Sequence, residues 1–158
     1  MRRAAYRYRQ SLHALRPRLD AGHLEFARQT LSEAEAVLFF AMERRDQRHA
    51  LEVTLRLCRG TDDRSLLVAA LLHDCGKASV PVWLRVLNVV SPIATGRLAA
   101  DGRGWRGAAY RLRHHMELGA VMAGEAGCSA TTVRLIRGRV EPDEAWRYEL
   151  LLAADDAS

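Results

Sequence analysis

The chain has 158 residues, of which 49% are hydrophobic, enough for one domain with a core and too few for two. No apolar run is long enough or free enough of charge to span a bilayer, and the basic start of the chain lacks the apolar region of a secretory signal. The three cysteines form no CxxC pair, which favours reduced thiols over a disulfide framework or a zinc knuckle. These features predict a cytoplasmic protein that is not embedded in a membrane.

The basic residues are unusual because the 24 lysines and arginines include a single lysine, Lys77. The net charge of +5 is compatible with a phosphorylated or nucleic-acid partner. The arginines are scattered, however, and no recognition motif or aromatic platform accompanies those near the start of the chain. A solvated surface is therefore the favoured interpretation, and nucleic acid is not an expected partner. The sequence indicates no particular oligomeric state.

Helical periodicity dominates the chain, and no stretch has the pattern of a strand. We predict an all-α fold in a single domain over residues 1–158, a bundle of about seven to nine helices with no sheet. The expected helices cover approximately residues 3–15, 20–30, 33–42, 45–58, 63–74, 81–92, 108–126, 130–137 and 143–156. Residues 93–107 contain four glycines and are expected to be irregular.

Capping residues mark several of these boundaries. Ser32 and Glu35 have the spacing of a capping box. Asp62 or Asp63 is expected to cap the helix predicted over residues 63–74, and Gly76 is expected at the C′ position beyond its end.

A histidine and an aspartate, His73 and Asp74, follow the apolar run of residues 66–72. At the last turn of a helix both side chains can reach a cation beyond the helix end, where the macrodipole also favours it. His49 lies on an apolar helical face, where a lone histidine is more often a core residue than a ligand. Asp155 follows a second apolar run, residues 150–154, which we expect to be buried. Burying such groups is costly unless something compensates them, and a shared divalent ion would do so.

In chain order these residues read H…HD…D, and with their surroundings they resemble the HD-domain proteins of the metal-dependent phosphohydrolase superfamily. The resemblance rests on four segments: RHALEV (48–53), LLHDCGK (71–77), HMELGA (115–120) and LAADD (152–156). It implies an HD-domain core over residues 44–158, with residues 1–43 as accessory N-terminal helices.

The resemblance implies that His49, His73, Asp74 and Asp155 ligate one divalent metal ion. Asp155 is preferred to Asp156 because it directly follows the alanine of the family's Ala-Asp ending. Imidazole and carboxylate ligands suit Mn, Fe, Co, Ni, Zn or Mg to differing degrees, and the sequence does not choose among them.

Two further residues are implied to act in catalysis beside Asp74. Lys77 matches the basic residue that meets a substrate phosphate, and His115 matches the histidine that serves a second metal in the two-metal, GYP-bearing branch. That branch has a His-His pair where this chain has Gly138 and Arg139, and no Gly-Tyr-Pro occurs. We therefore predict a mononuclear site and no cyclic-di-GMP cleavage, and expect His115 to contact the phosphate or orient a water.

The implied function is hydrolysis of a phosphomonoester, nucleotide or phosphodiester by a metal-activated water. Lys77, with Arg137 or Arg139, would neutralise the developing charge. The expected partner is a phosphorylated small molecule or nucleotide. A second interpretation is a catalytically silent regulatory or protein-interaction module, because a fold does not fix a function. The enzymatic interpretation is preferred.

Overall fold

The computed structural model describes residues 21–77, 84 and 104–158. These residues contain no strand, so the predicted all-α fold is confirmed for them. The helices expected at residues 3–15 and 81–92 lie outside the described residues. The described elements are α2 (Ala21–Thr30), α3 (Glu33–Ala41), α4 (Arg44–Leu57), α5 (Arg64–Leu72), η1 (Cys75–Lys77), α8 (Gly104–Glu125), α9 (Ala130–Arg137), η2 (Pro142–Glu144) and α10 (Ala145–Asp156).

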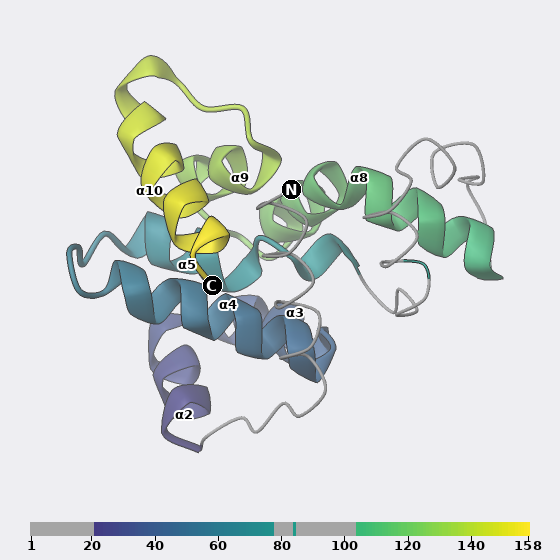
Figure 1. Ribbon diagram of the computed structural model, residues 1–158, viewed down its shortest axis with the longest axis horizontal. Helices are drawn as coiled ribbons and strands as arrows, with labels where there is room; N and C mark the ends of the chain where they lie inside the picture. Colours follow the sequence, from purple (N-terminus) through teal and green to yellow (C-terminus); the bar gives the residue numbers. More distant parts are fainter. Residues whose placement is uncertain (1–20, 78–83, 85–103) are drawn as a thin grey trace, which may run out of the picture.

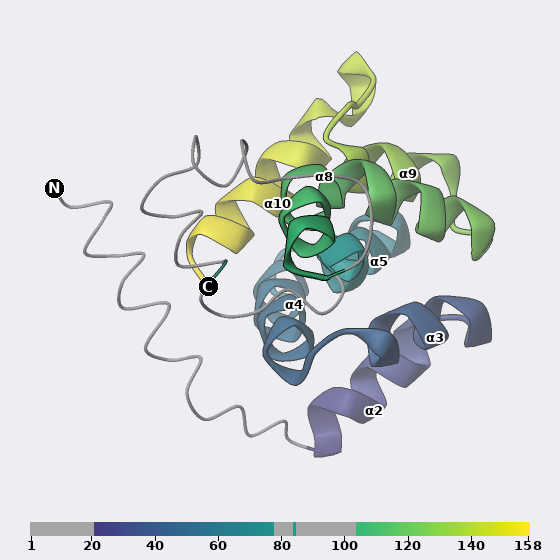
Figure 2. The same cartoon turned by 90° about the vertical axis from the view of Figure 1, so that its right-hand side faces the viewer.

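Helix α5 is the centre of the core because it is apolar on every side. Every residue from Leu66 to Leu72 is buried. A helix without a polar face has to be covered all round. In Figure 1, α4 lies below α5 and α9 and α10 lie above it, while α2 and α3 also contact it. Figure 2 shows the same packing from the side, with α8 beside α9.

The helices α2 and α3, which we expected to be accessory, contribute to the same core. Ala27, Leu31 and Phe39 are buried and belong to one cluster with the residues of α5. The described part of the N-terminal region therefore packs directly on the helix that precedes His73 and Asp74.

The capping residues explain where several helices begin and end. The Ser32 hydroxyl accepts a hydrogen bond from the Glu35 amide, and the Glu35 carboxylate accepts one from the Ser32 amide, which confirms the capping box. Asp63, rather than Asp62, caps α5 by accepting from the Leu66 amide. Gly138 adopts a left-handed conformation with a φ of 72° and ends α9.

Two predicted boundaries are wrong. Helix α5 ends at Leu72, and Gly76 lies in η1 without a positive φ, so it is not a C′ glycine. Helix α8 begins at Gly104, so residues 104–107 are helical instead of irregular. At Gly76 the backbone packs closely against α8, which explains why this glycine does not act as a helix stop.

The apolar run before Asp155 is only partly buried, contrary to the sequence-based expectation. Leu151 is buried, but Leu150 and Leu152 are 43% and 45% exposed. Helix α10 therefore packs along one face, as an outer helix does. In the part of the chain that the structure describes, no helix has the length and apolar character needed to cross a membrane.

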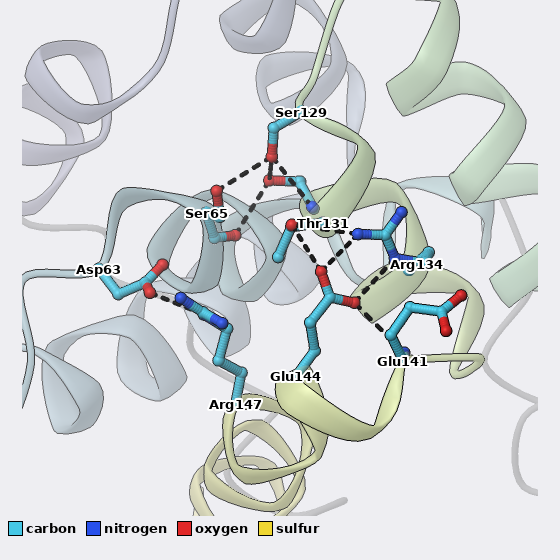
Figure 3. Close-up of polar contacts among 9 residues, drawn as sticks. Asp63, Ser65, Ser129, Thr131, Arg134, Glu141, Glu144 and Arg147 are labelled. Atoms are coloured by element: carbon cyan, nitrogen blue, oxygen red, sulfur yellow. Dashed lines mark hydrogen bonds and ion pairs between the residues drawn. The ribbon is translucent and has the colours of Figure 1, made fainter.

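A polar network ties the beginnings of α5, α9 and α10 together (Figure 3). The Arg147 guanidinium donates to Asp63 over 2.7 Å. The hydroxyls of Ser65 and Ser129 lie 3.0 Å apart, and the Thr132 hydroxyl donates to the Ser65 carbonyl. These contacts fix the start of α10 relative to the central helix.

Glu144, the last residue of η2, is the centre of the second half of this network. Its buried carboxylate accepts hydrogen bonds from the Arg134 guanidinium, at 2.8 Å for Nε, and from the Thr131 hydroxyl at 2.6 Å. Charge-assisted, two-point pairing of this kind is geometrically specific. It orients α10 against α9.

Replacing Glu144 with glutamine is expected to lower the free energy of unfolding at pH 7 much more than at pH 3. The hydrogen bonds from Arg134, opposed by burial, lower the pKa of Glu144 from 4.5 to about 2. A carboxyl whose pKa is lower in the folded protein stabilises the fold above its unfolded pKa and loses that contribution as the pH falls toward the folded value. Urea unfolding of both proteins at several pH values measures the difference, with the exposed Asp143→Asn as control. A difference that does not change with pH would contradict the assignment.

Candidate metal centre

His73 is the first residue beyond α5, and its imidazole is oriented by the backbone. Its Nδ1 lies 2.9 Å from the Ala70 carbonyl oxygen, which can only accept, so Nδ1 carries the proton. The other nitrogen, Nε2, is buried and has no hydrogen-bond partner among the described residues. A metal-ligating histidine usually donates one ring N–H to a carbonyl, which fixes the tautomer and leaves a bare lone pair on the other nitrogen.

Asp74 lies beside this lone pair and is only 3% exposed. Its Oδ1 is 3.5 Å from His73 Nε2, and its Oδ2 is 2.6 Å from the Lys77 ammonium. Burial alone would raise the pKa of Asp74, but the neighbouring His73 and Lys77 outweigh it and hold the pKa well below its usual range. Asp74 is therefore a buried carboxylate ion at neutral pH.

His49 approaches from α4 and contacts Asp155 on α10. Its Nε2 lies 2.7 Å from Asp155 Oδ1, and its ring meets the His73 ring edge-on with 5.3 Å between centroids. Burial lowers the pKa of His49, but the hydrogen bond to Asp155 and the charge of Asp74 raise it overall. For Asp155, burial raises the pKa, and the hydrogen bond from His49 together with the neighbouring His73 lowers it overall.

The structure places Asp155, and not its exposed neighbour Asp156, against the two imidazoles. Asp155 Oδ1 also lies 3.6 Å from His73 Nε2. Because the two residues are neighbours on a helix, only one of them can face α4 and α5.

These groups fit a divalent ion. One ligand atom each of His49, His73 and Asp74 lies within 4.8 Å of the others, and in the part of the chain described here this is the one such group. Asp155 lies outside that trio but contacts His49, so an ion would replace their hydrogen bond with two metal–ligand bonds. The residues could therefore hold an ion, whose identity the two imidazoles and two carboxylates leave open.

The two residues expected to meet substrate both lie near Asp74. Lys77 is bound to Asp74, as described above. His115 on α8 has its Nδ1 2.9 Å from the Leu112 carbonyl, which leaves its Nε2 as the lone-pair nitrogen. Burial and the nearby Lys77 charge lower the pKa of His115, which keeps the imidazole neutral near pH 7. Its neighbour His114 packs instead on the Tyr110 ring, with centroids 4.3 Å apart.

The arginines expected to help at the site are paired elsewhere. Arg137 and Arg139 both contact the Glu117 carboxylate, at 2.8 and 3.2 Å. They join α8 to the end of α9. Pairing of this kind agrees with the interpretation of the arginines as a solvated, charge-balanced surface.

A close backbone contact that the motifs did not reveal brings α8 to the site. A Cβ atom built on Gly76 would lie 2.1 Å from the His115 carbonyl oxygen and 2.6 Å from the Gly119 amide nitrogen. Only glycine permits this approach. The two glycines of the LLHDCGK and HMELG segments therefore meet at one point, which sets His115 near Asp74.

Comparison with protein families, curated proteins and solved structures found no match to this chain. Function therefore has to be inferred from the residues themselves.

Proposed function

We propose that this protein is a metal-dependent phosphohydrolase of the HD-domain kind. The observation that carries the proposal is the unpartnered, buried His73 Nε2, aimed at a cluster with His49, Asp74 and Asp155. A buried imidazole nitrogen without a partner is costly, and a divalent ion is the ligand that such a nitrogen and two carboxylates suit.

The chemistry of the proposal divides between the ion and the side chains. A bound divalent ion supplies a water of lowered pKa and polarises a phosphoryl oxygen. His49, His73, Asp74 and Asp155 would hold it. The neutral His115 imidazole can accept a hydrogen bond or a proton from a water or a phosphate through its Nε2.

One observation favours the alternative, a silent regulatory module. The carboxylates of Asp74 and Asp155 are already paired, with Lys77 and with His49, so much of the cluster is satisfied without an ion. Such a module would have the same fold but would not catalyse hydrolysis.

Metal analysis of the purified protein, together with a panel of phosphomonoesters, nucleotides and phosphodiesters, tests the proposal. We expect about one ion per chain and hydrolysis that a chelator abolishes and added Mn²⁺ restores. Asp155→Asn should lose both the bound ion and the hydrolysis, whereas Asp156→Asn should keep both. Two fully occupied ions would contradict the mononuclear prediction. Bound metal without turnover of any phosphate ester would favour the regulatory module.

A further inference from the structure

In the ion pair between Lys77 and Asp74, the two carboxylate oxygens have different neighbours. The Lys77 amide donates to the Asp74 carbonyl over 3.0 Å, so the ammonium starts from a fixed turn. Its Nζ donates to Asp74 Oδ2 over 2.6 Å, whereas Asp74 Oδ1 lies 3.5 Å from His73 Nε2. The lysine side chain is 22% exposed, so part of it is accessible to solvent.

A divalent ion changes the charge balance around this pair. In the metal-free cluster two carboxylates, Asp74 and Asp155, lie near one ammonium, that of Lys77. A divalent ion adds two positive charges to this cluster. Asp74 needs the ammonium before the ion arrives, because an uncompensated buried carboxylate is strongly destabilising. Afterwards the ion compensates Asp74, and the ammonium and the ion repel each other.

We propose that Lys77 exchanges partners: it neutralises Asp74 in the metal-free protein and binds a phosphate-type anion once a divalent ion is present. The ion and the anion then bind cooperatively, and each strengthens the other by the same factor. This inference rests on the metal site of the proposed function, but it concerns binding and does not require turnover. The neutral His115 beside Lys77 adds a hydrogen-bonding group for the anion without a competing charge.

The test is the affinity for Mn²⁺ with and without inorganic phosphate, measured by titration calorimetry at pH 7. In the unaltered protein phosphate should tighten Mn²⁺ binding on the order of tenfold. Lys77→Met should bind Mn²⁺ alone at least as tightly and should lose most of the phosphate effect. Arg64→Met is the matched control, because it removes a cation from a buried carboxylate, Glu35, at the other end of α5. It should keep both affinities.

A second measurement covers the loss of stability that Lys77→Met entails. Metal-free Lys77→Met should melt at a lower temperature, and Mn²⁺ should raise its Tm more than that of the unaltered protein. Lys77→Gln keeps a donor for Asp74 without the charge. Its metal-free form should also melt at a lower temperature, and Mn²⁺ should also raise its Tm more than that of the unaltered protein.

Three results would overturn the exchange: no Mn²⁺ binding by the unaltered protein, weaker Mn²⁺ binding by both Lys77 variants without phosphate, or an unchanged phosphate effect in them. Cooperative binding without turnover would refute the hydrolase and leave the exchange standing. Turnover together with an unchanged phosphate effect in both Lys77 variants would support the hydrolase and refute the exchange.

Discussion

Gly76→Ala is expected to destabilise the protein by about 3 kcal/mol or more, at the upper end of the cost of overpacking. The added methyl group would meet backbone atoms of α8, the His115 carbonyl oxygen at 2.1 Å and the Gly119 amide nitrogen at 2.6 Å. Backbone atoms of a helix cannot rotate away as a side chain can, so η1 and α8 would have to separate. Urea unfolding measures the loss. Mn²⁺ titration of the folded fraction should also show weaker binding, because η1 follows Asp74 directly.

Gly124→Ala is the matched control, since this glycine lies on α8, the helix that Gly76 contacts. The nearest atom to its added Cβ is Val133 Cγ2 at 3.9 Å, an ordinary contact. Alanine is a better helix former than glycine by about 0.8–1 kcal/mol, so this change should be neutral or stabilising. Equal stabilities of the two variants would show that the contact between η1 and α8 is looser than the structure indicates.

Asp74→Asn is expected to lower Mn²⁺ affinity by about a hundredfold or more, because loss of a direct ligand should cost more than loss of a group that only orients a ligand, which costs about 10–100-fold. It should also destabilise the metal-free protein by about 3 kcal/mol, because the partly buried Lys77 ammonium loses its counter-ion. Calorimetric titration measures the first effect and urea unfolding the second.

The stability difference caused by Asp74→Asn should also depend on pH. The neighbouring Lys77 and His73 hold the pKa of the carboxyl well below the usual 3.8, against the effect of burial. Its contribution is therefore complete above about pH 4 and declines as the pH falls below that value. Asp62→Asn, a change of an exposed carboxylate, should show neither effect. If Asp74→Asn retained full Mn²⁺ affinity, the assignment of this carboxylate as a ligand would be wrong.

Local signals in the sequence account for much of the fold. Periodic apolar residues identify the described helices, and short-range hydrogen bonds at Ser32 and Asp63 set where α3 and α5 begin. Such contacts join residues three or four apart, so they can be recognised without a structure. The pattern of His49, His73 and Asp155 likewise predicted side chains that the structure brings together.

The remaining features depend on distances between elements, which no local pattern encodes. Gly76 has the sequence context of a helix stop, yet its role is contact with a helix 39 to 43 residues further along the chain, at His115 and Gly119. Lys77 has the context of a substrate-binding residue, yet it occupies Asp74 Oδ2 in this structure. Both outcomes follow from how η1 packs on α8.

The hydrogen bond between His49 and Asp155 spans 106 positions of the chain. During synthesis the ribosome delivers α4 and α5 long before α10, so an unfinished chain has both imidazoles and Asp74 but lacks the carboxylate that closes the cluster. A contact so distant in sequence has a large entropic cost of loop closure unless the intervening helices have already packed. Completion of this cluster would therefore be a late event in folding and would distinguish a finished molecule from a partly folded one.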